Sequence, residues 1–322
     1  MKKKNICFIL LSLVLVYVGY SYWSKVKKDK WAKERPEIKY SEARENEVWG
    51  GVLRGNDAGL FYGTPLYDLA KEMSGIIVYF RNQDKIERLI SKLPKEYVNY
   101  QERKYGTTIG HFALRTNNII AIQKLLDKGL NPNIMDEGGK AIIIDINYFY
   151  YYPSEKLQTL RYMIKKGANV NLYSDKDYNT PLMEASRSGD LMNVKILINA
   201  GANPHFYKES YQENIDYTSY FSPLNTALTY GHINVVNYLI FDQKVDFRTL
   251  KYEETSKFHP GEYQILHKLR DMPFELNTQD YRDKMKLVAY LKTQGLDYKK
   301  TPIPENISTN PHYGNKEYLS KY

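Results

Sequence analysis

Hydrophobic residues in the middle of the chain recur three and four positions apart in two short runs separated by a glycine. In residues 179–204, Thr180 is suited to cap a first helix, and Pro181 is suited to its first turn, where no intrahelical N–H is needed. Gly189 then separates this helix from a second one. The apolar positions, which would form one buried face, are Leu182, Ala185, Val194, Leu197 and Ile198. The pattern predicts a helix-turn-helix unit that packs against a neighbour.

Similar units occur on both sides of this segment. Residues 222–240 and 108–133 repeat the pattern, and residues 160–171 repeat its second half after a degenerate first half at 141–148. Weaker copies begin near Thr64 and end near Gly295. Taken as equivalent, one apolar position per unit gives intervals of 36, 38, 34, 42 and 52 residues, at Leu89, Leu125, Met163, Leu197, Leu239 and Leu291. A repeat of about 33 residues with insertions explains these intervals.

These units resemble the ankyrin repeat, in which a TPLHxAA helix is followed by a GHxxIVxxLLxxGADVN helix and loop. Residues 179–204 read NTPLMEASRSGDLMNVKILINAGANP and match nearly the whole unit. The resemblance covers roughly residues 60–300. It implies an all-α ankyrin-repeat solenoid of about five to six helix-turn-helix units with atypical capping units at both ends.

The N-terminal segment resembles an export signal. Three lysines precede an apolar run from Ile6 to Val18, which is thirteen residues long, or eighteen if it is extended to Trp23. The shorter count suits a cleaved signal peptide and the longer one a short membrane-spanning helix. The tyrosines and Trp23 that precede a second group of lysines favour a retained anchor, one N-terminal apolar helix in the inner membrane, with the body in the periplasm. Cleavage would instead leave a soluble periplasmic or secreted protein.

The remaining segments divide by composition. Residues 1–24 are the signal-anchor or signal peptide, 25–59 are a charged spacer and lead-in, and 60–300 are the ankyrin-repeat domain. Residues 301–322 carry three prolines among polar residues and are expected to form a flexible tail.

Charge alters the choice of partner. The chain has a formal charge of +9, but residues 1–35 hold nine of the 46 Lys/Arg and two of the 37 Asp/Glu. The rest therefore has 37 basic against 35 acidic residues, a charge of only +2. A nearly neutral body lacks the basic footprint on which phosphate-backbone binding depends, so nucleic acid is not an expected partner.

No motif indicates catalysis. The sequence contains no GxSxG elbow, glycine-rich phosphate loop or HExxH helix, so no enzyme activity, small-molecule substrate or cofactor is expected. His111 and His232 occupy recurring repeat positions and are expected to bond to the backbone. The other histidines form no HxH or HxxxH pair, and the single cysteine is Cys7, so no metal site is expected.

Two aromatic insertions depart from what the repeat requires. Tyrosine supplies a large contact area with a polar tip at low entropic cost, so these insertions are the candidate partner-binding surface. Their candidate residues are Tyr148, Tyr150 and Tyr151 in the third unit, and Phe206, Tyr207, Tyr211, Tyr217 and Tyr220 between the fourth and fifth units. The alternative is that these side chains fold back and cover the solenoid.

The expected function is protein binding. Exported bacterial ankyrin proteins with one N-terminal anchor resemble immunity proteins that block antibacterial effectors of type VI secretion, including phospholipases. The partner would then be a toxin or lipase effector, with membrane attachment through the N-terminal helix. A periplasmic scaffold or stress-protection factor and a secreted ankyrin effector are the alternatives.

Overall fold

The computed structural model describes residues 55–74, 82–147, 153–174, 176–212, 217–254 and 259–322. The chain divides into two compact units. The first comprises Met1–Leu53 and Tyr62–Thr64, and the second, treated below, comprises Arg54–Phe61 and Pro65–Tyr322. The expected anchor at residues 1–24 lies outside the described residues. Among the helices that are described, none combines the length and hydrophobicity needed to cross a bilayer.

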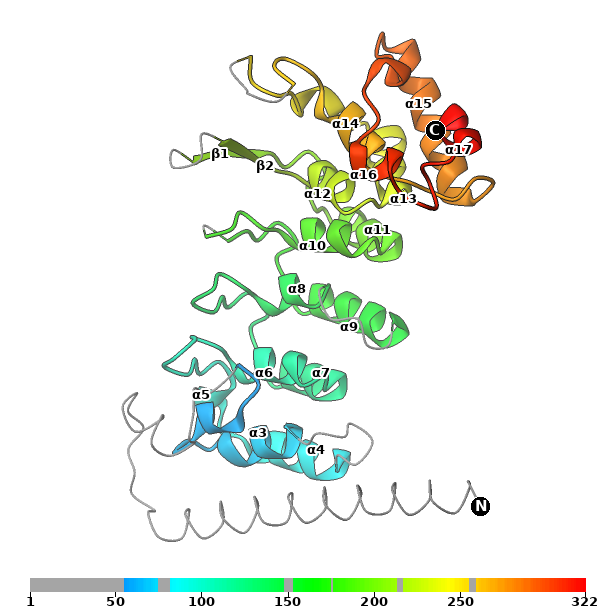
Figure 1. Cartoon of the computed structure of the whole chain (residues 1–322). Helices are drawn as coiled ribbons and strands as arrows, with labels where there is room; N and C mark the ends of the chain where they lie inside the picture. Colours follow the sequence, from blue (N-terminus) through cyan, green and yellow to red (C-terminus); the bar gives the residue numbers. More distant parts are fainter. Residues whose placement is uncertain (1–54, 75–81, 148–152, 175, 213–216, 255–258) are drawn as a thin grey trace, which may run out of the picture. The chain divides into compact units, whose positions relative to one another are not determined.

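Six helix pairs follow one another along the described part of the second unit (Figure 1). They are α3 (Tyr67–Met73) with α4 (Gln83–Lys92), α6 (Ile109–Arg115) with α7 (Ile119–Asp127), α8 (Ile142–Asp145) with α9 (Pro153–Lys165), α10 (Pro181–Ser188) with α11 (Leu191–Asn199), α12 (Pro223–Thr229) with α13 (Ile233–Asn237), and α14 (Gln264–Arg270) with α15 (Gln279–Thr293). First helices contact first helices of the next pair, as α10 contacts α8 and α12, and second helices do the same, as α7 contacts α9. This is the expected stack of repeats.

Short elements complete the described chain. Single turns of 3-10 helix lie at Ala58–Phe61, Phe247–Thr249 and Tyr298–Lys300, and a turn of π-helix at Tyr238–Asp242 extends α13. Helix α5 (Lys95–Val98) follows α4, while α16 (Glu305–Ser308) and α17 (Lys316–Lys321) follow the last pair.

The fourth pair forms as its sequence predicts. The Thr180 hydroxyl accepts the Met183 amide N–H at 3.1 Å and caps α10, which begins at Pro181. Gly189 ends the helix in the left-handed region, with φ 69°. A Cβ at that position would lie 2.3 Å from Nδ1 of His232, so both the backbone angle and the close packing require glycine.

The core lies between the stacked helices, and the second helices contribute equivalent positions to it. Leu125, Met163, Leu197, Leu239 and Leu291 are all fully buried, which confirms the spacing predicted for them. The first pair differs, because α4 buries Ile86 and Ile90 and leaves Leu89 half-buried.

The all-α expectation is wrong in one place. Strands β1 (Lys208–Gln212) and β2 (Tyr217–Phe221) form an antiparallel pair between the fourth and fifth units, with Lys208 opposite Phe221 and Gln212 opposite Tyr217. Residues 217–221 read YTSYF, and tyrosine, threonine and phenylalanine fit the pleated surface of a strand. The fold is therefore mostly helical with a two-stranded hairpin.

The expected flexible tail is also wrong. Residues 301–322 contain α16 and α17, and Ile307, Tyr318 and Tyr322 form a buried cluster. The Tyr318 hydroxyl donates to the Phe274 carbonyl at 2.9 Å, and Arg270 donates to the main-chain oxygen of Tyr322 at 3.0 Å. Since Tyr318 and Tyr322 lie four positions apart, both rings fall on one face of the last helix and bury together.

Candidate partner-binding surface

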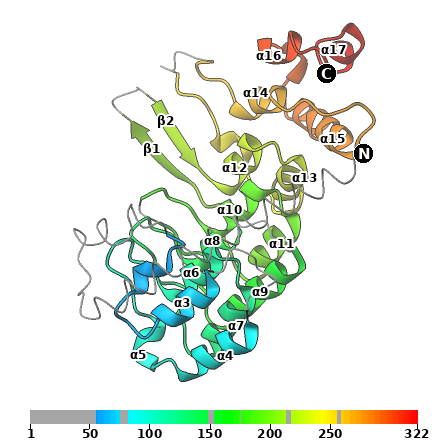
Figure 2. The same cartoon turned by 60° about the horizontal axis from the view of Figure 1, so that its bottom comes forward.

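The loops that join one helix pair to the next lie on one side of the stack, away from the second helices (Figures 1 and 2). We call these loops fingers and number them along the chain. They are finger 1 (residues 93–108), finger 2 (128–141), finger 3 (166–180), finger 4 (200–222) and finger 5 (243–263). Finger 4 contains the β1–β2 hairpin.

An asparagine ladder joins the bases of fingers 1 to 4. Each side-chain amide of Asn99, Asn133 and Asn171 donates to the carbonyl of a glycine in the next finger and accepts an N–H two residues further on. The donated bonds reach Gly129, Gly167 and Gly201 at 3.0, 3.0 and 2.8 Å, and the accepted ones come from Asn131, Asn169 and Asn203 at 2.7, 2.7 and 2.8 Å. Each asparagine side chain thus bonds to two main-chain groups of the next finger, and these bonds hold successive fingers in one register.

Finger 4 is joined to finger 5 differently, because His205 occupies the next position in the asparagine series. The Tyr207 hydroxyl lies 3.2 Å from the Thr249 carbonyl oxygen and also contacts the Glu209 carboxylate. The Tyr220 hydroxyl donates to the Lys251 carbonyl at 3.0 Å. Tyr207 and Tyr220 are half-buried, and their hydroxyls contact the neighbouring finger of the same chain.

The other candidate residues have different positions. The Phe206 ring packs against Tyr173 of finger 3, with centroids 5.9 Å apart. Tyr211 and Tyr217 lie at the distal end of the hairpin, where Tyr211 pairs with Thr218 and Tyr217 with Gln212. The run containing Tyr148, Tyr150 and Tyr151 lies outside the described residues. Contact with a partner remains a prediction for all of these side chains.

The bonds between fingers 4 and 5 predict a stability change. We expect Tyr207→Phe and Tyr220→Phe each to lower the free energy of unfolding by about 0.5 to 1.5 kcal/mol, because both remove a donor and keep the ring. Tyr220 donates to the Lys251 carbonyl, and the Tyr207 hydroxyl is shared between the Thr249 carbonyl and the Glu209 carboxylate. Urea unfolding of the full chain measures this change. Tyr173→Phe in finger 3 is the control. Unchanged midpoints for both variants would show that the hydroxyls do not hold finger 5.

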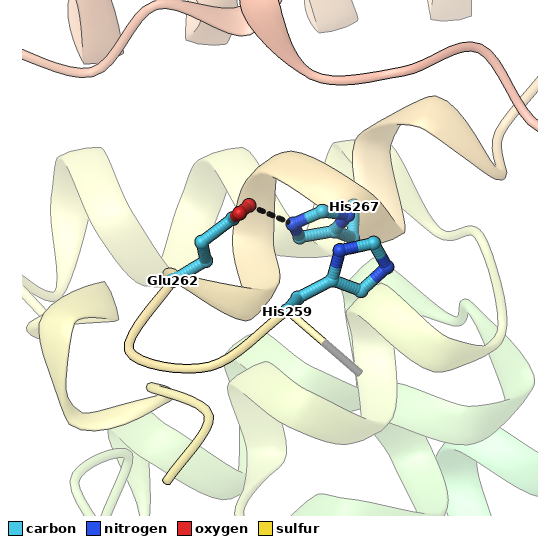
Figure 3. Close-up of side chains that lie close together, drawn as sticks. All are labelled: His259, Glu262 and His267. Carbon is cyan, nitrogen blue, oxygen red and sulfur yellow. Dashed lines mark hydrogen bonds and ion pairs between the residues drawn. The ribbon is translucent and has the colours of Figure 1, made fainter. Parts of the chain in front are cut away.

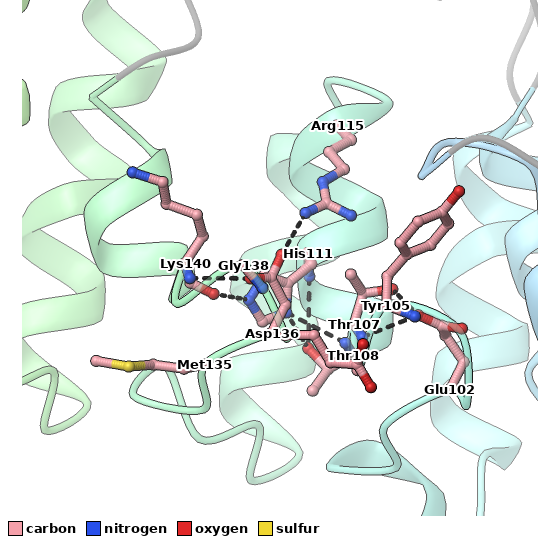
Figure 4. A network of polar contacts seen from close by, with 12 residues as sticks. Glu102, Tyr105, Thr107, Thr108, His111, Arg115, Met135, Asp136, Gly138 and Lys140 are labelled. Atoms are coloured by element: carbon pink, nitrogen blue, oxygen red, sulfur yellow. Dashed lines mark hydrogen bonds and ion pairs between the residues drawn. The ribbon is translucent and has the colours of Figure 1, made fainter. Parts of the chain in front are cut away.

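A polar network makes fingers 1 and 2 rigid (Figure 4). The Glu102 carboxylate accepts N–H bonds from Lys104, Tyr105 and Thr107 at 2.7, 2.9 and 3.0 Å. The Asp136 carboxylate accepts the amides of Gly138 and Lys140 at 2.9 Å each and pairs with Arg115 at 2.6 Å. These bonds satisfy main-chain donors that the turns leave open, so the fingers are fixed before any partner binds.

His111 and His232 bond to the backbone, as expected. Nδ1 of His111 accepts the Thr108 amide at 3.2 Å, and Nε2 donates to the Lys140 carbonyl at 2.8 Å (Figure 4). Burial lowers the pKa of His111 to about 4, so the ring is neutral at pH 7. Nε2 of His232 makes the equivalent bond to the Arg187 carbonyl at 2.8 Å.

Charged side chains near finger 3 are paired. Lys140 Nζ lies 2.5 Å from the Asp177 carboxylate and 3.7 Å from that of Glu184, and Arg187 lies 3.4 Å from Glu184. Burial raises the pKa of the nearby Asp145 to about 6. The positive charges of Lys140 and Arg187 are therefore paired with carboxylates, one of them the buried Glu184, and this pairing leaves little to attract a polyanion.

A pocket of about 470 Å³ lies where α12 and α14 end, and sequence reasoning missed it. Its lining includes Tyr230, Lys268, Asp271, Met272 and Phe274. Tyr230 is 50% exposed, and its ring lies 5.2 Å from the Arg187 guanidinium. Tyr230 precedes the turn glycine of the fifth unit, and Ser188 occupies the same position in the fourth. This difference between the two units was the only signal of the pocket in the sequences compared.

Three potential metal ligands meet where the sequence indicated none. His259, Glu262 and His267 place their ligand atoms within 4.8 Å of one another (Figure 3). Sequence spacing did not indicate this cluster, because finger 5 folds back on α14 and brings His259 beside His267 although they are eight positions apart. Only a search for ligands across a turn would have found this cluster.

Comparison with known proteins agrees with this architecture. Residues 151–250 match the family described as ankyrin repeats (3 copies). A stretch of 127 residues is 26% identical to a protein of Acanthamoeba polyphaga mimivirus that is named as an ankyrin repeat protein, covering 39% of this chain and 73% of that protein. The family match, residues 151–250, runs from the second helix of the third unit through the fifth unit. Residues 151–250 are therefore similar to ankyrin repeats, a fold that serves as a protein-interaction module, and the helix pairs on either side stack in the same way.

Proposed function

We propose that this protein binds another protein without catalysis, through fingers 3 to 5 and the pocket beside Tyr230. One observation carries the proposal: the hydrogen-bonded fingers 3 and 4 present Tyr173 and the β1–β2 hairpin, and the next unit adds the exposed ring of Tyr230, which lies beside Arg187 of the fourth unit. Exposed tyrosines at ordered positions are the residues that interfaces favour.

The rigidity of the fingers supports this proposal energetically. Binding costs free energy when loops must be ordered, and the asparagine ladder orders fingers 1 to 4 in the unbound chain. The pocket between α12 and α14 accommodates one side chain of a partner, with Tyr230 and Phe274 as apolar walls and Lys268 and Asp271 as polar ones. Such a pocket is where we expect the largest energetic contribution per residue.

At a finer level, we propose that the protein is bacterial and is held on the periplasmic side of the inner membrane by residues 1–24. Its partner there is an antibacterial effector of type VI secretion, such as a phospholipase, whose active-site entrance it covers. The apolar N-terminal run between lysines supports the location, and the resemblance to exported ankyrin immunity proteins supports the partner. Mass spectrometry of the mature protein tests the anchor, since a retained segment leaves the N-terminus uncleaved.

The binding site has a direct test with an effector encoded beside this gene. We expect Tyr230→Ala to weaken binding of the purified effector by about 10-fold or more, because truncating a tyrosine at an interface hot spot costs about 2 kcal/mol or more and about 1.4 kcal/mol corresponds to 10-fold. Isothermal titration calorimetry measures the affinity. Met192→Ala is the matched control, because its side chain is 53% exposed and does not line the pocket. Equal affinity of the Tyr230 variant would remove the pocket from the interface. Cells that survive the effector without this chain would refute the immunity role.

A further inference from the structure

We propose that His259, Glu262 and His267 form a binding site for a divalent late transition metal ion, with Zn²⁺ as the ion of choice. The three side chains supply two imidazole nitrogens and one carboxylate oxygen, all within 4.8 Å of one another. His267 comes from α14, while His259 and Glu262 come from the end of finger 5 (Figure 3).

The backbone holds the three residues together. Lys251 and Tyr263 form an antiparallel bridge, the Tyr252 amide donates to the Glu262 carbonyl at 2.9 Å, and the Glu262 amide donates to the His259 carbonyl at 3.1 Å. The side chain of Tyr252 packs against both imidazoles, with ring centroids 5.7 Å from each. Main-chain bonds therefore fix the backbone of His259 and Glu262, and α14 fixes that of His267. Rotation of the three side chains can then bring their ligand atoms to the distances that a metal ion requires.

The distances suit a metal ion after a small adjustment. Nε2 of His267 and a Glu262 carboxylate oxygen are 2.6 Å apart, and the imidazole centroids are 3.6 Å apart. Tetrahedral Zn²⁺ with bonds of about 2.0 Å separates its ligand atoms by about 3.3 Å. A metal ion would thus replace the hydrogen bond between Glu262 and His267 and separate the two rings slightly.

The electrostatics favour a cation at this point. The Glu262 carboxylate lies beside the two imidazoles, so the cluster offers one negative charge and two nitrogen ligands to a cation. The neutral imidazole is the form that coordinates metals. Lys251 of finger 5 pairs with Glu254 at 2.8 Å, while the Glu262 carboxylate contacts His267.

The donor set selects the class of ion. Imidazole nitrogens suit zinc, nickel and copper, whereas calcium and magnesium require sites made of oxygen ligands. Three protein ligands leave at least one coordination position for solvent. A bound ion would connect finger 5 directly to α14 and so order the last finger of the array.

Metal titration of the full chain without a polyhistidine tag tests this site. We expect one equivalent of Co²⁺ to bind with visible d–d absorption, and Zn²⁺ to displace it. We expect His259→Ala and Glu262→Gln to weaken Zn²⁺ binding by more than about 10-fold, since even outer-shell changes cost about 10- to 100-fold. His205→Ala, which removes a histidine outside the cluster, should bind Zn²⁺ like the unaltered chain.

Thermal melts in EDTA establish that the variants fold. With Zn²⁺ added, we expect the melting temperature of the unaltered chain and the His205 variant to rise, and that of the Glu262→Gln variant to stay unchanged. Absence of stoichiometric Zn²⁺ binding by the unaltered chain would overturn the proposal. Equal Zn²⁺ affinity of the His259 and Glu262 variants would overturn it as well.

Discussion

Leu197→Ala is expected to lower the free energy of unfolding by about 2 to 5 kcal/mol, the range measured for truncating a buried leucine. Leu197 is 0% exposed and lies on α11, which packs against α9, α10 and α13. Truncation of its side chain therefore opens a void between three successive repeats, where α9, α10 and α13 surround α11. Urea unfolding at neutral pH, followed by circular dichroism, measures the change.

Met192→Ala is the control for this variant, since it lies on the same helix and its side chain is 53% exposed. We expect a change within about 0.5 kcal/mol there, because surface substitutions rarely exceed that. If both variants unfolded at the same urea concentration as the unaltered chain, the placement of Leu197 in the core between repeats would be wrong.

Acid is expected to destabilise the protein through His111. Burial depresses its pKa in the folded chain from 6.5 to about 4, so below pH 6.5 the unfolded chain binds a proton that the folded chain does not. Stability is therefore fully present above pH 6.5 and falls as the pH drops toward 4. The loss amounts to about 3 kcal/mol, at 1.36 kcal/mol for each pH unit between the two pKa values. Urea midpoints at neutral pH and near pH 4 measure it.

His111→Asn separates this effect from other titrations. Asparagine can accept and donate at this position but does not titrate, so the variant should be less stable at neutral pH and lose less stability in acid. Asp145 acts in the opposite direction, because burial raises its pKa to about 6 and the folded chain binds that proton first. Asp145 is present in both proteins, so the difference between their pH profiles belongs to His111. Parallel profiles would contradict this assignment.

The repeated core could be predicted from sequence because its signals are local. Thr180 caps α10, Gly189 ends it, and Leu125, Leu197 and Leu239 are buried at matching positions. Each of these depends on residues three or four positions away, or on the backbone angle of a single residue. The same reasoning placed an enlarged finger between the fourth and fifth units.

Features that depend on contacts between distant parts of the chain could not be predicted from the sequence. The polar composition of residues 301–322 suggested a flexible tail, but Tyr318 and Tyr322 find a surface that includes Arg270, some fifty residues earlier. The strands of finger 4 depend on pairing between Lys208 and Phe221 across a turn. The meeting of His259 with His267 likewise follows from how finger 5 folds back, for which no spacing rule exists.

The position of the enlarged finger was predicted, but the contacts of its tyrosines were not. Tyrosine content indicated contact area, but not whether another finger or another protein would use it. Tyr207 and Tyr220 direct their hydroxyls to finger 5, where the asparagine series has ended at His205. Tyr230 went unnoticed because it stands alone in an otherwise regular repeat.

The attachment of finger 4 has a consequence for protein engineering. Among the described residues, its bonds to finger 5 come from Tyr207, just before β1, and from Tyr220, one residue before the end of β2. A peptide grafted into finger 4 should therefore leave Tyr207 and Tyr220 in place, so that finger 5 keeps its attachment to the preceding unit. Redesign of recognition at this loop then has two fixed positions around which the sequence can change.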